Sequence, residues 1–365
     1  MVKQEVFQLH PTGWESDPAD EYFKLSTLDY CVGQVFTNWA LFFKLPDADK
    51  PKTIPVLKRG LEITLSQSRH LCGVIEPHPD GSGGLCFHKK KDSTVDFHVQ
   101  WLDGAEDEGK YPSFDELEKR HFVSQSLGDM STWCVPPMTY GEKPEAQPTS
   151  NPKGSAFKAS FIRGGLVFMM HHHHYGNDVM GWAGEMHQLA ENCAAIWRSE
   201  DLPSWDPACL DLSRVTAADL PEDKRVDGPE SPLKHPDHKL NQWLLFHLPK
   251  SKAAELKKMA SPADGSYWIS SYDAYMAYIW RVLSKHRAKL FKPDLTQNVL
   301  WGEAVDMRRR FHDPPMPERT QGNVVWVALS TQSSVPQITG NEAVSEAPLS
   351  KLAWYATLSY GLPSP

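Results

Sequence analysis

A run of four histidines followed by an aspartate is the part of this sequence best suited to chemistry. The run occupies residues 171–174, and Asp178 lies four residues after His174. An imidazole with an ordinary pKa of about 6.5 is largely neutral at neutral pH, so it can take a proton from a hydroxyl that attacks an acyl carbonyl. Such general-base help raises a rate by about 100- to 10,000-fold. These residues predict a proton-transfer site with His174 as its base.

Three other interpretations of the histidine run stay open. A purification-tag fragment fits poorly, because the run is internal and lies between an apolar stretch and a helical pattern. A metal site would use at most two alternate histidines, because neighbours on a strand point to opposite faces, and no cysteine or acidic cluster is nearby. A structural role in the core is the interpretation we prefer for His171 and His172.

The flanking segments predict how the histidines are held. Residues 156–170 alternate and then become wholly apolar, which is typical of a buried strand. From Met180 to Trp197 the apolar residues recur at helical spacing, so a long amphipathic helix is expected. Asp178 would begin that helix, where a carboxylate is favoured. The predicted order is strand, sharp turn and helix, with His174 at the strand's end.

Other segments complete the expected secondary structure. Strands are expected at 35–43, 73–75, 85–87, 96–101, 243–248, near Leu300 and at 324–329. Helices are expected at 55–69, from Lys250, after Ser270 and at 349–357. The proline-rich residues 136–154 predict an exposed irregular loop, and the proline-rich, acidic residues 200–238 predict a surface linker.

Composition limits the class of protein. The chain has 365 residues, 40% of them hydrophobic, and a formal charge of -8, which argues against a nucleic-acid partner. It has no segment of the roughly 20 apolar residues that span a membrane and no signal-like start. Six dispersed cysteines without CxxC pairs are typical of reduced thiols. We therefore expect a soluble, cytoplasmic protein that does not act on membranes.

Several stretches resemble one enzyme family. Residues 173–178 resemble the HHxxxD signature of the BAHD acyltransferases, and the chain is most similar to the fungal branch that includes trichothecene 3-O-acetyltransferases. Residues 25–29 are similar to the family's LSxLD element, and residues 57–75 to its first helix and the following strand. Two later segments also match the family in order: the helix after the linker, 270–281, and the DxR and GN segment, 304–323.

The resemblance implies the architecture. It predicts an α/β fold of two chloramphenicol-acetyltransferase-like domains, each a mixed sheet flanked by helices, with the second incomplete. The N-terminal domain carrying HxxxD would span residues 1–199 and the linker residues 200–239. The partial C-terminal domain would span residues 240–365.

The resemblance also implies the function. An acyl group, expected to be acetyl, would move from acyl-CoA to a hydroxyl or amine of a small molecule, expected to be a secondary metabolite. His174 would be the general base, while Asp178 would turn away from the cleft and pair with Arg308. The co-substrate would be acetyl-CoA, no metal would take part, and the folded chain would be a monomer. Two alternatives are a truncated, impaired relative that acts as a binding scaffold and a metal-dependent hydrolase.

Two departures from the family pattern generate a prediction. Val179 and Met180 separate the motif's aspartate from Gly181, and nothing after Asn323 resembles the family's DFGWG segment. We expect this chain to be less soluble and less active than a relative that carries DFGWG, and addition of such a segment to restore both properties. The monomer fraction and acetyl-CoA turnover of the two chains measure this. A monodisperse, fully active 365-residue chain would contradict it.

Overall fold

The computed structural model describes residues 2–141, 143–217, 247–329 and 337–360. The chain packs into two units: the first unit is Met1–Leu245 with Arg308–Val324, and the second unit is Phe246–Met307 with Val325–Pro365. The sequence-based division at residues 199 and 240 stays a prediction. By packing, however, residues 308–324 go with the first unit, and this segment matters for the candidate site.

The first unit contains a five-stranded mixed sheet with the order β1-β6-β7-β8-β3, in which only β6 and β7 are parallel. Its strands are β1 (Lys3–Leu9), β3 (Phe36–Lys44), β6 (Val95–Trp101), β7 (Ser155–Ile162) and β8 (Gly165–His173). A smaller antiparallel sheet has the order β2-β5-β4. Its strands are β2 (Asp20–Lys24), β4 (Val74–Pro77) and β5 (Leu85–Lys90).

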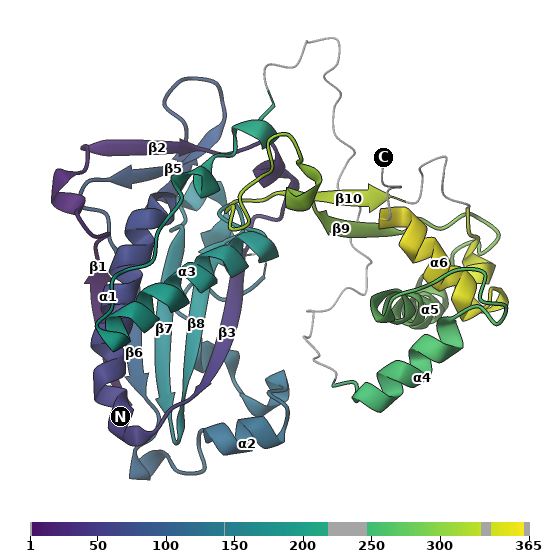
Figure 1. Cartoon of the computed structure of the whole chain (residues 1–365), viewed down its shortest axis with the longest axis horizontal. Helices are drawn as coiled ribbons and strands as arrows, with labels where there is room; N and C mark the ends of the chain where they lie inside the picture. The colour runs from purple at the N-terminus through teal and green to yellow at the C-terminus, as the bar shows by residue number, and fades with distance from the viewer. Residues whose placement is uncertain (1, 142, 218–246, 330–336, 361–365) are drawn as a thin grey trace. The chain divides into compact units, whose positions relative to one another are not determined.

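Two long helices cover one face of the five-stranded sheet (Figure 1). Two long helices, α1 (Lys50–Gln67) and α3 (Val179–Arg198), share one apolar core with alternate residues of β6, β7 and β8. The short helix α2 (Phe114–Lys119) packs with the other residues of β8, including Val167 and Met169. Strand β8 is therefore buried on both faces, which explains its continuous apolar run.

The single strand expected over 156–170 is wrong: the structure has a hairpin of β7 and β8 there. Its turn contains Gly164, whose φ of 70° lies in the left-handed region that glycine adopts without strain. Both strands are buried on both faces, so the apolar pattern hides the turn between them. Polarity at Arg163 and the glycine were the signals of this turn.

The proline-rich residues 136–154 are irregular, as expected, but they are not simply exposed. They contain short 3-10 turns at Pro144–Ala146 and Pro148–Ser150. Met138 and Ala146 are buried in a small core with Phe36 of β3. This segment thus forms part of the packing at the end of β8.

The second unit is largely helical. It consists of α4 (Lys250–Ala260), α5 (Ser271–Phe291), a π-helical turn (Glu342–Glu346), α6 (Leu349–Tyr360) and the antiparallel pair β9 (Gly302–Asp306) and β10 (Val325–Leu329). The helix expected after Ser270 is confirmed, and Ser270 and Asp273 form a capping box at its start. The strand expected at 243–248 lies largely outside the described residues.

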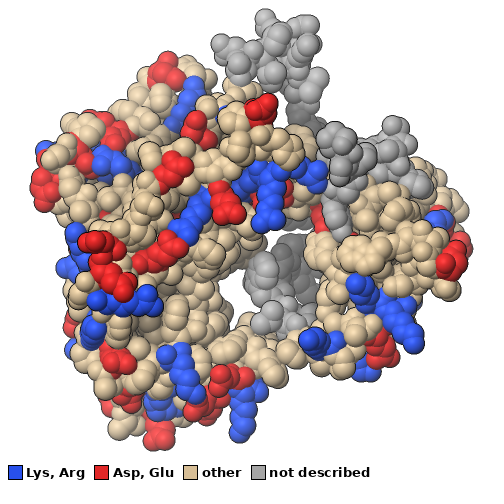
Figure 2. Space-filling view, in the orientation of Figure 1, with Lys and Arg blue, Asp and Glu red and all other residues tan. Residues whose placement is uncertain are grey.

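Charges on the visible face of the first unit are mixed. Figure 2 shows basic and acidic side chains interspersed there. Exposed ion pairs in the first unit include Arg319 with Glu191. Within the described ranges, no helix is long and apolar enough to cross a bilayer.

The contact between α1 and α3 generates a stability prediction. A Cβ added at Gly60 of α1 would overlap Cys193 Sγ of α3. Overpacking costs about 1 to 3 kcal/mol, which offsets or exceeds the roughly 1 kcal/mol that alanine gains over glycine in a helix. Gly60→Ala should therefore lower the free energy of unfolding by up to about 2 kcal/mol, measured by chemical denaturation.

Making the same Gly60→Ala change in a Cys193→Ala protein tests whether the Cys193 sulfur causes the loss of stability. In a Cys193→Ala protein the overlapping sulfur is gone, so Gly60→Ala should become stabilising by about 1 kcal/mol. As a control, Gly33→Ala adds a Cβ whose nearest atoms lie 3.7 Å away and should change stability little. A Gly60 penalty that persists without the Cys193 sulfur would refute the steric explanation.

Candidate active site

The histidine run starts in β8, where three of its members are completely buried. His171, His172 and His173 are each 0% exposed. Their side chains alternate, so His171 and His173 share the face of α2 while His172 faces α1 and α3. Neighbouring histidines in the folded strand therefore point to opposite faces of the sheet, so at most two alternate histidines of the run could bind one metal ion.

His171 and His173 have no free lone pair. His171 Nε2 accepts from the Val135 N–H at 3.2 Å, and its Nδ1 is hydrogen-bonded to the Asn38 side-chain amide at 2.9 Å. His173 Nδ1 accepts from the Tyr175 N–H, and its Nε2 donates to the Ala146 carbonyl at 2.9 Å.

Burial also keeps these two rings neutral. It lowers the pKa of His171 to about 3 and that of His173 to about 4. A neutral ring whose two nitrogens are both occupied cannot take a proton from a substrate. Both residues therefore have structural roles.

His172 lies on the opposite face against helix α3. Its ring centroid lies 4.2 Å from that of Trp182 with the two ring planes tilted by 56°. Nε2 is 3.3 Å from a carboxylate oxygen of Glu185, although neither ring nitrogen has a hydrogen-bond partner in the described part of the chain. Glu185 is only 1% exposed, and its other oxygen accepts from Asn177 Nδ2 at 3.1 Å. The buried Glu185 carboxylate thus contacts both His172 of β8 and Asn177 of the turn that follows it.

His174 differs from the other three. It is the first residue after β8, and its side chain is half-buried. Its backbone N–H donates to the Val35 carbonyl at 2.9 Å, and its carbonyl accepts from Asn323 Nδ2 at 2.9 Å. Ring atom Nδ1 has no hydrogen-bond partner within the described ranges. The backbone of His174 is thus fixed from two sides, while the buried Nδ1 of its ring is left without a hydrogen bond.

Asp178 and Arg308, which the resemblance paired, are brought together by the structure. Arg308 Nη1 and Nη2 donate to the two carboxylate oxygens of Asp178 at 3.0 and 2.9 Å, a bidentate arrangement. Asp178 also caps α3 by accepting from the Gly181 N–H at 2.8 Å, and it accepts from the Val324 N–H at 2.8 Å. Both partners are buried.

The glycine and asparagine that follow Arg308 attach to the same turn. Gly322, with φ of 84°, donates its N–H to Asn177 Oδ1 at 2.7 Å. Asn323 Nδ2 donates to Asp29 Oδ1 at 2.8 Å as well as to the carbonyls of His174 and Tyr175. The turn bearing His174 is therefore hydrogen-bonded to segments near both ends of the chain.

Sequence reasoning missed four of these residues. Asp29 and Asn323 lie in the LSxLD and GN segments that carried the resemblance, but no role was assigned to either. Glu185 had a usable signal, because it is an acid at helical spacing between the apolar Trp182 and Leu189 on the buried face of α3. Asn177 had none.

Metal-ligating side chains do not cluster. No group of three or more histidine, cysteine or acidic residues that could hold a metal occurs in the part of the chain that the structure describes. All six cysteines are free thiols.

The Asp178 to Arg308 pair generates a prediction. Removing one partner of a buried pair costs about 3 to 5 kcal/mol because it leaves the other charge uncompensated. Asp178→Ala and Arg308→Ala should each lower the free energy of unfolding by about this amount, and the double variant should lose less than the sum. Asp178→Ala should be the more damaging single change because it also uncaps α3, worth about 1 kcal/mol.

The control is the exposed pair of Arg319 and Glu191, joined at 2.8 Å. Its removal should cost about 1 kcal/mol or less. Strict additivity of the Asp178 and Arg308 changes in a denaturation cycle would show that the two side chains do not interact.

Two protein-family models match the chain. Residues 35–193 match the trichothecene 3-O-acetyltransferase-like N-terminal domain, and residues 157–353 match the Transferase family. The second match includes the histidine run, Asp178 and Arg308.

Named relatives agree with these models. Acetyltransferase FGR3 of Gibberella zeae is 56% identical over 355 residues, which are 97% of this chain and 71% of that protein. The trichothecene 3-O-acetyltransferase TRI101 of Fusarium sporotrichioides is 22% identical over 294 residues, 75% of this chain and 60% of the relative. The chain thus spans 71% of the first relative's length and less of the second.

Solved structures share the fold. TRI101 of F. graminearum, crystallised with coenzyme A and T-2 mycotoxin, superposes with a TM-score of 0.67 at 19% identity, over 93% of this chain and 74% of that one. Vinorine synthase gives 0.65 at 20% identity, over 100% and 77%. The mixed α/β fold expected from the sequence is confirmed. The chain belongs to the Transferase family of BAHD acyl-CoA-dependent acyltransferases, in the branch with a trichothecene 3-O-acetyltransferase-like N-terminal domain.

Proposed function

We propose that this protein transfers an acetyl group from acetyl-CoA to a hydroxyl of a small secondary metabolite, with His174 as the general base. The observation that carries the proposal is the difference between His174 and its neighbours. His171, His172 and His173 are each 0% exposed, whereas His174 is half-buried and its backbone is held by Val35 and Asn323. A base must be reachable and fixed in position, and His174 is the one histidine of the run whose side chain is not fully buried.

The proposed reaction is a direct transfer without an acyl-enzyme. The neutral His174 ring accepts the proton of the acceptor hydroxyl while the hydroxyl oxygen attacks the thioester carbonyl carbon. The tetrahedral adduct collapses, the carbon–sulfur bond breaks, and the imidazolium returns the proton to the departing thiolate. The products are the acyl ester and free CoA thiol, so protons and bonds balance.

Asp178 and Arg308 act in this proposal as positioning residues. Their hydrogen bonds hold the turn between β8 and α3 and so fix the backbone position from which the His174 side chain extends. Positioning of this kind matters because a displacement of about 1 Å in a catalytic group can cost about 100-fold in rate. Neither side chain has to contact the substrate.

The choice of substrates rests on the relatives. FGR3 is named an acetyltransferase, and TRI101 of F. graminearum was crystallised with coenzyme A and a mycotoxin. By analogy we propose acetyl-CoA as donor, a hydroxylated small molecule as acceptor and a monomeric protein. The six free cysteines support a reducing compartment, and we propose the cytosol.

His174→Ala should reduce acetyl transfer by about 100- to 10,000-fold because it removes the base while leaving the buried histidines in place. Release of CoA thiol measures the reaction, and coenzyme A binding by calorimetry checks that the fold is intact. His187→Ala is the matched control, because His187 is exposed on α3, and it should change turnover little.

Two outcomes would contradict the proposal. Near-wild-type turnover in His174→Ala would remove His174 as the base. Coenzyme A binding by the unaltered chain, without turnover of any tested alcohol or amine, would favour the binding scaffold instead.

A further inference from the structure

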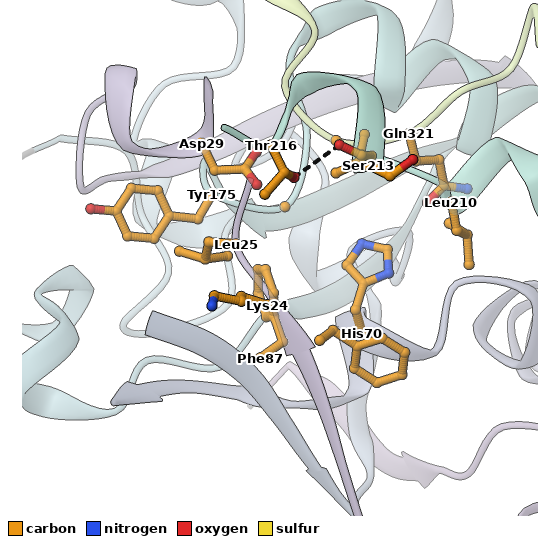
Figure 3. Close-up of a pocket in the computed structure, with 14 residues that line it drawn as sticks. Lys24, Leu25, Asp29, His70, Phe87, Tyr175, Leu210, Ser213, Thr216 and Gln321 are labelled. Carbon is orange, nitrogen blue, oxygen red and sulfur yellow. Dashed lines mark hydrogen bonds between the residues drawn. The ribbon is translucent and has the colours of Figure 1, made fainter. Parts of the chain in front are cut away.

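The turn after β8 places residues 175–177 between the proposed base and Asp178. Tyr175 and Gly176 line a cavity of about 280 Å³ (Figure 3). Asn177 is not among the lining residues, and it is 1% exposed. Its side chain instead contacts Glu185, a buried acid of α3. Glu185 is therefore a buried ionisable group to which the proposed reaction assigns no role.

Hydrogen bonds fix the orientation of the Asn177 amide. The Gly322 N–H donates to Asn177 Oδ1 at 2.7 Å, and a backbone N–H can only donate, so the amide oxygen must face Gly322. The amide nitrogen then faces α3, where Nδ2 donates to Glu185 Oε2 at 3.1 Å. This is the one acceptor of Asn177 Nδ2 in the described part of the chain. The carboxylate thus holds the amide in the orientation that the Gly322 N–H requires.

Gly322 connects this amide with the proposed base. The Asp178 N–H donates to the Gly322 carbonyl at 3.2 Å, so Gly322 is bonded to two consecutive residues of the turn. The next residue, Asn323, donates from Nδ2 to the His174 carbonyl at 2.9 Å. Glu185 is therefore linked to the backbone of His174 by a chain of hydrogen bonds.

Stability alone does not account for an acid at position 185. Glu185 is 1% exposed, and the bond from Asn177 is the one hydrogen bond of its side chain among the described residues. Its second oxygen lies 3.3 Å from His172 Nε2, but neither nitrogen of that ring has a hydrogen-bond partner there. A buried carboxylate with so few bonds is destabilising, and a well-packed apolar side chain would be more favourable. The acid is better explained by its effect on the turn.

We propose that Glu185 is a positioning residue for the proposed base, acting through the Asn177 amide and the segment Gly322–Asn323. This role rests on the proposed function, in which His174 is the base. Without the Glu185 acceptor the Asn177 amide can turn and release the Gly322 N–H, so the backbone that carries His174 shifts. A displacement of about 1 Å in a catalytic group can cost about 100-fold in rate.

Two substitutions at one position test this role by kinetics. Glu185→Leu removes the acceptor, so kcat for acetyl transfer should fall by about 100-fold. The KM for acetyl-CoA should change little, because the proposed role involves no contact with substrate. Glu185→Gln keeps an oxygen that accepts from Asn177 Nδ2, so it should retain kcat within about tenfold of the wild-type value. Equal losses in the two variants would contradict a role based on this hydrogen bond.

Asn192→Leu is the matched control. Asn192 is also completely buried on α3, but its Nδ2 donates to Thr64 Oγ1 at 2.9 Å and to Gln67 Oε1 at 3.0 Å, both on α1. Its replacement should lower the free energy of unfolding, because it leaves these side chains unpaired, but kcat of the folded protein should stay near the wild-type value. A loss of kcat as large as in Glu185→Leu would indicate general damage to α3 and overturn the proposal.

A double-variant cycle tests whether Glu185 acts through Asn177. In an Asn177→Ala protein the amide is already absent, so adding Glu185→Leu should cause little further loss of kcat. A further loss of about 100-fold in that protein would show that Glu185 acts through another contact, such as His172, and would overturn the proposed route.

Hydrogen exchange tests the same role without turnover. The protons to follow are the backbone N–H of Gly322, bonded to Asn177, and that of His174, bonded to the Val35 carbonyl. Relative to other amides of the first unit, Glu185→Leu should speed their exchange by about tenfold, whereas the Asn192→Leu control should not. Unchanged exchange in Glu185→Leu would overturn the proposal. If the unaltered chain transferred no acetyl group, the proposed function would fail, and the exchange rates would still decide whether Glu185 holds the turn.

Discussion

The buried carboxylate of Asp178 is the interaction on which the candidate site depends. Its oxygens accept from Gly181 of α3, from both terminal nitrogens of Arg308 and from the Val324 backbone. Withdrawing a carboxylate from water is expensive, and only a paired, fully hydrogen-bonded geometry offsets that cost. Because this one group satisfies three chain segments at once, the turn after β8 has a single well-defined conformation.

Other contacts extend this arrangement across the first unit. The Arg308 guanidinium also donates to the carbonyls of Thr320 and Gly322, which fixes the segment that follows it. Asn323 then connects Asp29, near the start of the chain, with the backbone of His174. Residues separated by almost the whole sequence thus determine the position of the proposed base. A network of this type is sensitive to loss of any member, because each loss leaves a buried polar group unpaired.

The sequence predicted the local elements of this site better than their packing. Strand β8, helix α3 and the capping role of Asp178 followed from periodicity and from helix-terminus preferences. The pairing of Asp178 with Arg308 came only from the resemblance, since Arg308 in a run of three arginines looks like a solvated surface residue. The hairpin turn at Gly164 was missed because both of its strands are apolar throughout. The packing of residues 308–324 on the first unit could not be predicted, because periodicity reports which face is buried and not what buries it.

The deep burial of His171 and His173 makes the stability of the folded protein depend on pH. Their pKa values in the folded chain, about 3 and about 4, lie below the ordinary value of 6.5, to which they return on unfolding. Above that value both states are neutral and the histidines do not affect stability. As the pH falls below 6.5, these histidines bind protons in the unfolded chain but not in the folded chain. The free energy of unfolding therefore decreases progressively toward pH 3. The strand that leads to the proposed base thereby makes acid a destabilising condition for this fold.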